Sequence, residues 1–433
     1  MWNRLRTSLP IQMVLAALLA WLTAFLLTSF LSEPRLQSAL ANGDFDTIFL
    51  AKTIYLGLLK MVVGIMVLFS LIEGISNIGS MVRLKNLGSK TLIFYTFTTT
   101  IAISLGLGAS LLMPQWQPLA GHVALADNVT LIDSNDATGG AILTKMITMA
   151  LVNPVAAIAQ GNLLAIVVFA LMFGTAILIA LPKENALHEV ISAINKVINT
   201  LVSGIVKLSP LAIFAIIFEI SLTSNSQLFG QLALFALLVF VLTMIHGGIV
   251  LPLIAKLATG ISPLTLFKAI SAPMAMALAT SSSAATLPLA MQSAEEELGV
   301  SPSVTSMVLP LGAVMNMDGT ALFEGVAAIF LAQLFGVDLS TSGLVMIFIM
   351  AMVSSVGAPG MPSGSMSGMQ LVLLAAGIPL EAIAILLIIE RPLDTFRTAV
   401  NVEGDIIASL VVDKWQASTH KSATLETANL TIG

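Results

Sequence analysis

The sequence predicts an all-α polytopic membrane protein, and its composition and charge distribution support that prediction. Of the 433 residues, 57% are hydrophobic and only 9% are charged, and the mean hydropathy is +1.00. Soluble globular domains carry about 25% charged residues. Six stretches contain no Asp, Glu, Lys or Arg: residues 7–32, 91–126, 146–182, 220–255, 269–294 and 339–380. Each exceeds the ~20 residues that a helix needs to cross a bilayer, and none alternates as a barrel strand does.

The distribution of Lys and Arg predicts how the chain lies in the membrane. Arg4 and Arg6 precede the first apolar run, which is too long for a signal peptide, so we expect a retained first helix. Residues 83–90 carry three basic side chains, whereas residues 114–143 carry three Asp and no Lys or Arg. Since basic loops stay inside, we expect a multi-pass protein of the plasma membrane (the bacterial inner membrane) with both termini cytoplasmic. The absence of Cys excludes disulfides, and nothing indicates a nucleic-acid partner.

No long polar stretch divides residues 1–433, so we expect a single membrane domain, but its second half contains two interrupted apolar segments. The interruptions are residues 280–288 (TSSSAATLP) and 354–365 (SSVGAPGMPSGS). Gly and Pro break the helical hydrogen-bond ladder, and Ser competes for it. Irregular backbone at membrane depth requires protein or water around it, so each interruption is predicted to be the tip of a re-entrant hairpin. Such pairs are typical of transporters with inverted repeats. The alternative is two kinked core helices packed through small residues.

The last apolar helix carries a polar stripe that predicts a buried binding site. A spacing of i, i+3, i+4, i+7 and i+11 places on one helical face Asp394, Arg397, Thr398, Asn401 and Asp405. Charges at membrane depth need internal partners. The guanidinium of Arg397 suits a carboxylate and Asp394 suits an ammonium group, a combination that matches an acidic amino acid. The alternative is an Arg397–Asp394 ion pair that only holds helices together. We assign no site to Glu390 and Arg391, because charges near a helix start extend to the membrane surface.

The segment NMDGT, residues 316–320, predicts a cation site inside an apolar stretch. Gly319 allows the helix to break and expose carbonyl oxygens, and Asn316 and Asp318 add hard oxygen donors of the kind that Na⁺ requires. Asn401 and Asp405 would add an amide and a carboxylate. The alternative is that Asp318 merely caps a helix fragment.

Two further signals are weaker. Tyr95, Thr98 and Thr99 share a helical face, although Thr hydroxyls often bond only to their own helix. Glu324 lies one turn beyond Thr320 in an apolar helix, where a carboxyl group without a cationic partner favours its neutral form. Glu324 is therefore a candidate proton carrier, or equally a protonated structural residue. The four His residues show no metal-ligand spacing.

Three motifs in this order resemble those of the dicarboxylate/amino acid:cation symporters, the glutamate transporter family. They are SSSAATLP at residues 281–288, NMDGT at 316–320 and DxxRTxxNVxGD at 394–405. The resemblance spans most of the chain. It implies a homotrimer in membrane lipid, with eight transmembrane helices, two re-entrant helical hairpins, inverted repeats and elevator-type movement. A scaffold part would cover about 1–80 and 143–224, and a transport part about 88–112 and 228–416.

The resemblance also implies roles for residues by position. The substrate site would be lined by Ser282, Ser283, Thr320, Met361, Asp394, Arg397, Thr398 and Asn401. Asp394 would bind the amino group, and Arg397 the distal carboxylate. One sodium site would use Gly312, Asn316, Asn401 and Asp405. A second would use Tyr95, Thr98, Thr99, Asn316 and Asp318. A third would use backbone oxygens of Val314, Ser355, Val356 and Ala358.

Individual residues favour one function within the family. Met317 and Asp405 favour coupling to Na⁺, Asp394 favours an amino acid over a plain C4-dicarboxylate, and Arg397 argues against neutral substrates. Ser281 and Thr395 stand where many acidic amino acid carriers have a second arginine. We expect a sodium-coupled symporter of aspartate or glutamate, with proton co-transport through Glu324 as a hypothesis. The alternatives are a sodium-coupled dicarboxylate symporter and a channel. No nucleophile–base pair or metal cluster in the sequence favours an enzyme.

Overall fold

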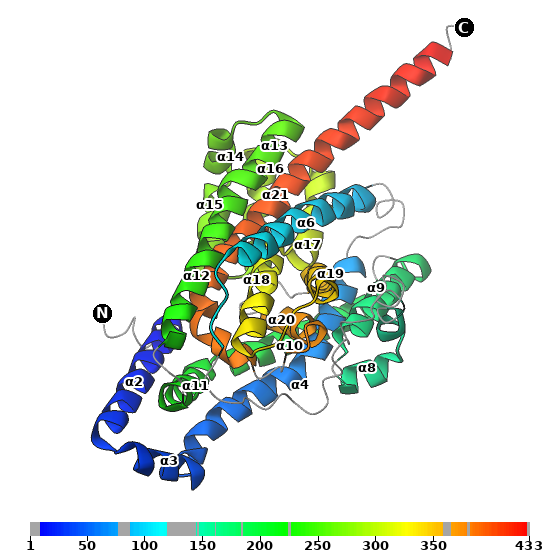
Figure 1. Cartoon of the computed structure of the whole chain (residues 1–433). Coiled ribbons are helices and arrows are strands. Elements are labelled where there is room, and N and C mark those ends of the chain that lie inside the picture. Colours follow the sequence, from blue (N-terminus) through cyan, green and yellow to red (C-terminus); the bar gives the residue numbers. More distant parts are fainter. Residues whose placement is uncertain are drawn as a thin grey trace.

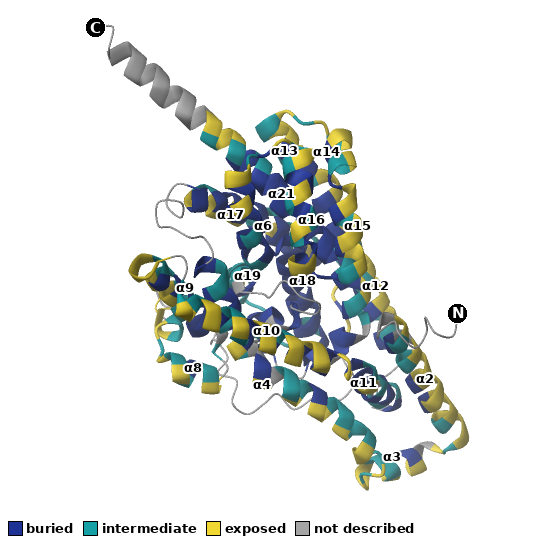
Figure 2. Cartoon of the chain, turned by 180° about the vertical axis from the view of Figure 1, so that it is seen from behind, coloured by how far each residue is buried: buried dark blue, intermediate teal, exposed yellow. Residues whose placement is uncertain are grey.

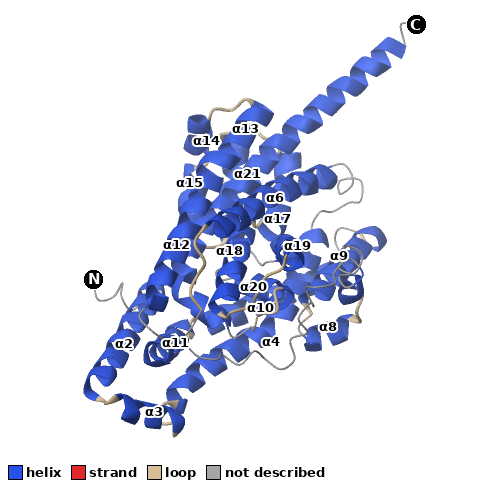
Figure 3. Ribbon diagram, viewed as in Figure 1, coloured by secondary structure: helices blue, strands red, loops and turns tan. Residues whose placement is uncertain are grey.

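The chain is a bundle of helices. The computed structural model describes residues 9–76, 87–118, 144, 147–160, 162–182, 185–223, 227–357, 365–378 and 382–430, and every regular element within these ranges is a helix (Figure 3). This arrangement confirms the all-α prediction. The long apolar helices are consistent with a polytopic membrane protein, because a helix satisfies all its backbone hydrogen bonds within itself.

Seven helices of the first half form one side of the molecule (Figure 1). α2 packs against α11, and α4 packs against α9, α10 and α11. Their starts follow local chemistry, since Pro34 lies in the first turn of α3 and the side chains of Asn162 and Asn185 cap α9 and α10. The bounds are α2 Leu9–Phe30, α3 Glu33–Ala41, α4 Asp46–Ser76, α8 Pro154–Gln160, α9 Leu163–Ala180, α10 Ala186–Val206 and α11 Ser209–Thr223.

The remaining long helices surround α18, which is the most deeply buried element. α18 packs against α6, α12, α19 and α21. In an apolar 18-residue window of Pro302–Leu334, the segment that contains α17 and α18, 94% of the residues are buried, whereas in such a window of Ile11–Phe30 in α2 only 18% are buried (Figure 2). α2 therefore presents its apolar surface outward, as a lipid-facing helix does. The bounds are α6 Ser89–Leu112, α12 Gln227–Ile245, the π-helical η2 His246–Val250, α13 Leu251–Thr259, α17 Pro302–Met315, α18 Asp318–Leu334 and α21 Ile383–Leu430.

The two interrupted segments are broken helices. In the first, α14 (Pro263–Ala269) and α15 (Ser271–Thr280) meet at a bend of 60°. The chain then reverses at Ser281, whose φ of 50° is left-handed, and α16 (Ser283–Glu296) packs back against α15. In the second, α19 (Thr341–Gly357) packs against α20 (Ser365–Ala375). The predicted tip between them, residues 358–364, lies outside the described residues.

Helix length gives fewer spans than the eight expected. Among the described residues, six helices are long and apolar enough to cross a membrane, or seven if the bent α14–α15 pair counts as one. The difference has a physical reason, because α9, α11 and α19 are apolar but shorter. The exact number of spans stays a prediction.

A close contact between α6 and α18 gives a test of this packing. A Cβ added at Gly106 would lie 3.0 Å from the Leu322 carbonyl oxygen and 3.2 Å from Val326 Cγ2, whereas one added at Gly108 would meet nothing within 4 Å. Small residues allow helices to approach closely in membranes. We expect Gly106→Leu to lower stability by about 1–3 kcal/mol, as overpacking does, and Gly108→Leu to have little effect. Thermal unfolding in detergent measures both, and equal melting temperatures would contradict the packing.

Candidate functional site

The polar stripe of α21 is buried among other helices. Asp394, Thr398 and Asn401 are 3–5% exposed, and Arg397 is fully buried. The stripe faces α18, and α16, α17 and α20 also pack against α21 (Figure 1). Because no water reaches these groups, each must find a partner within the protein or in a bound ligand.

Arg397 lies at the centre of an ionic cluster. Its Nη2 donates to Glu390 Oε1 at 3.0 Å, to Ser365 Oγ at 3.1 Å and to Asp394 Oδ1 at 3.2 Å. Its guanidinium carbon lies 4.0 Å from the centroid of the Phe323 ring, a cation–π contact. One side chain therefore connects α21, α20 and α18.

Glu390 corrects the sequence interpretation. It was expected near the membrane surface without a role, but it is 1% exposed and is an ion-pair partner of Arg397. Arg391 also faces the cluster, because its Nη1 lies 3.8 Å from Asp394 Oδ2. The spacing of seven residues between Glu390 and Arg397 is a helical repeat that places both on one face of α21. That spacing could have indicated from the sequence that Glu390 lies on the same face of α21 as Arg397.

The rest of the Arg397 fork points to a ligand. Its Nε and Nη1 are buried and have no hydrogen-bond partner among the described residues. An unsatisfied buried donor is costly, and charge-assisted hydrogen bonds from guanidinium N–H groups to carboxylate oxygens are among the stronger ones in proteins. The cluster can therefore hold a carboxylate on Arg397, with the acidic groups of Glu390 and Asp394 close by for a cation.

The break between α17 and α18 lies directly against α21. Asn401 Oδ1 accepts from the Gly319 N–H at 2.8 Å, and its Nδ2 contacts Met317 Sδ at 3.2 Å and Thr320 Oγ1 at 3.4 Å. A Cβ at Gly319 would lie 2.9 Å from the Arg397 carbonyl oxygen, so only glycine permits this approach. The predicted substrate residues Thr320, Arg397 and Asn401 are thus brought together.

A second group of oxygen donors surrounds Asp405. Asn316 Nδ2 donates to Asp405 Oδ1 at 2.9 Å, while the Asn316 Oδ1 is buried without a hydrogen-bond partner in the described part of the chain. Gly312 lies beside both Asp405 and Tyr95, since an added Cβ would collide with the Asp405 carboxylate and come within 2.5 Å of the Tyr95 hydroxyl oxygen. These residues can supply hard oxygen ligands of the kind that Na⁺ requires.

Asp318 belongs to the second predicted sodium site, and its carboxylate also contacts a residue that the sequence did not indicate, His246. Thr99 Oγ1 donates to Asp318 Oδ1 at 2.6 Å, and His246 Nε2 lies 3.1 Å from Asp318 Oδ2. His246 is fully buried at the start of η2. No ligand spacing pointed to it, because the contact joins residues 72 positions apart.

The hydroxyl groups of three other predicted site residues bond to backbone carbonyl oxygens. Thr98 bonds to the Tyr95 carbonyl of its own helix at 3.2 Å, and the Tyr95 hydroxyl donates to the Val308 carbonyl at 2.9 Å. The Ser355 hydroxyl bonds to the Met352 carbonyl at 2.8 Å. Ser355 and Val356 lie in the last turn of α19, near its end at Gly357, while Met361 and Ala358 lie outside the described residues.

The predicted first-hairpin residues form the start of α16. Ser282 caps it, since its Oγ accepts from the Ala285 N–H at 3.2 Å, and Ser283 is its first residue and is buried. The helix packs against α21. Backbone N–H groups at a helix start favour an anionic group of a ligand.

Glu324 lies between α18 and the second interrupted segment. Its Oε1 accepts from Ser354 Oγ at 2.8 Å, and its Oε2 is buried without a hydrogen-bond partner among the residues described. Gly368 of α20 lies against both side chains and leaves no room for a Cβ. The carboxyl group therefore contacts both α19 and α20.

Glu403 is a second buried acid that the sequence analysis passed over. It is 1% exposed, and its Oε1 has no hydrogen-bond partner within the described ranges. Its Oε2 faces η2, because a Cβ at Gly247 would lie 3.1 Å from it. Its place between Asn401 and Asp405 on α21 was visible in the sequence, but nothing there showed that it points inward.

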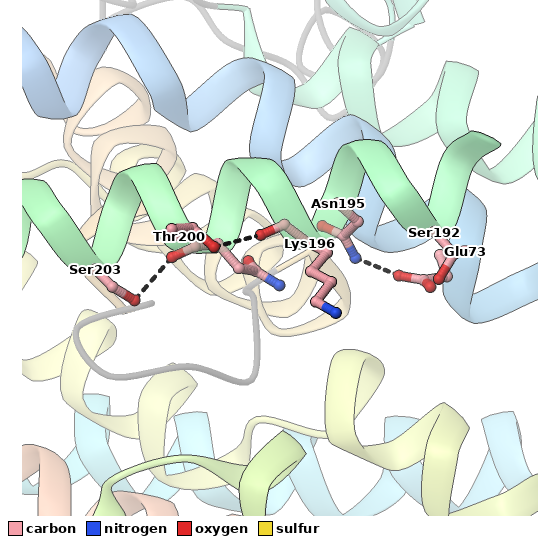
Figure 4. A pocket seen from close by; sticks show the side chains of 7 residues that line it. Glu73, Ser192, Asn195, Lys196, Thr200 and Ser203 are labelled. Carbon is pink, nitrogen blue, oxygen red and sulfur yellow. Dashed lines mark hydrogen bonds between the residues drawn. The ribbon is translucent and has the colours of Figure 1, made fainter. Parts of the chain in front are cut away.

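A polar cavity of about 350 Å³ lies apart from this site, between α4 and α10 (Figure 4). Asn195 joins the two helices by donating to Glu73 and accepting from Ser70. Lys196, Thr200 and Ser203 line the same face of α10. None of the predicted substrate or sodium residues lines this cavity.

Comparisons with known proteins agree with the arrangement of the motifs. The sequence profile of the sodium:dicarboxylate symporter family matches residues 9–415. The chain is 32% identical over 375 residues to the proton/glutamate-aspartate symporter of Escherichia coli (strain K12), covering 84% of each chain. It is 31% identical over 372 residues to the proton/sodium-glutamate symport protein of Geobacillus stearothermophilus, covering 84% of this chain and 86% of that one. It is 32% identical over 402 residues to the neutral amino acid transporter B(0) of Homo sapiens, covering 85% and 74%. The chain therefore belongs to the sodium:dicarboxylate symporter family.

Proposed function

We propose that this protein is a sodium-coupled symporter of the acidic amino acids aspartate and glutamate. The observation that supports this proposal most directly is the half-satisfied guanidinium of Arg397, whose Nε and Nη1 are buried without hydrogen-bond partners among the described residues. The relatives from E. coli and G. stearothermophilus are named for symport of glutamate, or of glutamate and aspartate. The distal carboxylate would bind Arg397 and the amino group would bind Asp394.

Sodium would bind among the oxygens on either side of the α17–α18 break. Asp405, Asn316 and the carbonyl of Gly312 would form one site, with Asn401, and Asp318 with Thr99 would form another. Both groups include a side chain of residues 316–320, Asn316 in one and Asp318 in the other, and the backbone of this segment at Gly319 also touches Arg397 and Asn401. Sodium would thus order the segment that shapes the substrate site, and each ligand would raise the affinity for the other.

We also propose the architecture that the family motifs imply. It comprises eight membrane helices with two re-entrant hairpins, a homotrimer in the bacterial inner membrane, and an elevator movement of the transport part. The broken helices α14–α16 and α19–α20 support the two hairpins.

The second candidate is a sodium-coupled dicarboxylate symporter, which the name of the family favours. A dicarboxylate lacks an ammonium group, so Asp394 would have no substrate contact. A competition experiment distinguishes the two candidate substrates. If the substrate is an amino acid, excess succinate should leave the uptake of labelled aspartate unchanged.

Arg397 gives the first prediction. Arg397→Lys keeps the charge but loses the planar fork and its hydrogen bonds, and we expect aspartate binding to weaken by about 1.5–3 kcal/mol, the usual contribution of a hydrogen bond to a charged group. Uptake of labelled aspartate into proteoliposomes measures the loss. Thr395→Ala is the control, because the Thr395 hydroxyl donates to the Pro392 carbonyl of its own helix and to no other described residue. Full uptake by well-folded Arg397→Lys would refute the assigned role.

Gly312 gives the second prediction. In Gly312→Ala the new methyl group would displace the Asp405 carboxylate. We expect the sodium concentration for half-maximal uptake to rise at least ~10-fold, which corresponds to about 1.4 kcal/mol. Gly108→Ala, with open space around it, is the matched control. Unchanged sodium dependence in Gly312→Ala would remove Asp405 from the sodium site.

Glu324 gives the third prediction. If the loaded carrier moves only with a neutral carboxyl at Glu324, wild-type uptake should slow as pH rises, because fewer molecules hold the proton. Glu324→Gln is always neutral and should transport at a rate that does not depend on pH. Uptake measured between about pH 5 and about pH 9 tests this prediction, because carboxyl groups buried in proteins titrate in that range. The same pH profile for both proteins would exclude Glu324 as proton carrier.

A further inference from the structure

An apolar groove lies on the outside of α6, α13 and α21, beyond the candidate site. It has a volume of about 480 Å³ and is lined by side chains that include Ile93, Phe97, Leu257 and Trp415. Three of these are well exposed: Ile93 at 64%, Phe97 at 53% and Leu257 at 78%. The groove is thus open along its length, and its volume falls in the range of ~300–1,000 Å³ that is usual for small-molecule sites.

Two lysines cross one end of the groove. Lys90 Nζ donates to the Trp415 carbonyl at 3.3 Å, which connects α6 to α21. Lys414 Nζ donates to the Thr259 carbonyl at 2.6 Å, which connects α21 to the end of α13. An ammonium group has three donors, and Lys414 has no ion-pair partner among the described residues. It can therefore still bind an anion.

Acidic side chains near the groove point elsewhere. The Asp413 carboxylate accepts from the Ser301 N–H at 3.3 Å and from its hydroxyl at 2.5 Å, on the far side of α21. None of the described residues that line the groove is acidic. Lys414, which has no ion-pair partner among the described residues, therefore gives this end of the groove a positive charge.

This end also lies where the three helices leave the apolar layer. α6 begins at Ser89, one residue before Lys90, and α13 ends at Thr259 with the left-handed Gly260. The α21 sequence becomes polar after Trp415. Trp and Lys side chains at the ends of apolar spans mark the interface between lipid and water.

We propose that the groove holds an acyl chain of an anionic phospholipid, whose phosphate lies between Lys90 and Lys414. Basic pockets between membrane helices bind anionic headgroups, and the apolar lining below accommodates the chain. Positive charge at the rim favours this occupant over the apolar segment of another protein. The phosphate would contact Lys414, which connects α21 to α13, and Lys90, which connects α6 to α21. The lipid would thereby hold the three helices together.

Trp415 provides the test. In a protein whose other tryptophans are replaced (W2F, W21F, W116F), the fluorescence of Trp415 is measured in bilayers with increasing brominated phosphatidylglycerol or brominated phosphatidylcholine. Bromine quenches a tryptophan that it contacts. We expect brominated phosphatidylglycerol to quench Trp415 at a mole fraction roughly 10-fold lower than brominated phosphatidylcholine, because about two surface lysines contribute to the binding of an anionic lipid.

Two variants separate the proposed site from general attraction of anionic lipid. K90Q/K414Q should lose the preference for phosphatidylglycerol. K256Q should keep it, because Lys256 lies roughly 200° around α13 from the groove residues Ile254 and Ala258. Thermal melting confirms that each variant is folded. Equal quenching by both lipids in the parent protein, a preference retained in K90Q/K414Q, or no quenching by either lipid would overturn the proposal.

Discussion

A fully buried guanidinium must be paired, and in this chain the pairing of Arg397 determines how the central helices meet. Its Nη2 binds Glu390 and Asp394 on its own helix and Ser365 on α20, while its flat face covers Phe323 on α18. An unpaired charge at this depth would cost several kcal/mol. Arg397 therefore contributes to fixing the positions of α18 and α20 relative to α21, and it borders the space beside its unsatisfied nitrogens.

The break between α17 and α18 connects the residues around Arg397 with the residues proposed to bind cations. Gly319 lies against the Arg397 backbone, and its N–H bonds to Asn401. On the other side of the same break, Asn316 bonds to Asp405, and Asp318 bonds to Thr99 and His246. The residues proposed to bind cations and those proposed to bind a carboxylate are thus joined by a few residues of irregular backbone. Such backbone is stable in a membrane only because protein surrounds it.

Local patterns in the sequence predicted the helical class, the polar stripe of α21 and the break at Ser281, because each depends on neighbouring residues. The stripe is a helical repeat, and the Ser-rich tract disfavours helix in any setting. Glu390 was misplaced, since its distance from the helix start could not be judged without the helix boundaries, and Glu403 was missed because nothing in the sequence showed that it points inward. His246 and the Glu73–Asn195 pair were missed because they rest on contacts between distant segments. The number of membrane spans could not be determined from the sequence, because an apolar helix that is too short to cross the membrane has the same composition as one that does.

The central claim is that sodium and an acidic amino acid bind to one coupled site, and calorimetric titration of the purified protein tests it most directly. The affinity for L-aspartate would be measured over a series of sodium concentrations at constant ionic strength, with choline as the replacement ion. The account predicts that aspartate affinity rises steeply with sodium, and that saturating aspartate raises sodium affinity by the same factor. An aspartate affinity that is unchanged when choline replaces sodium would contradict it.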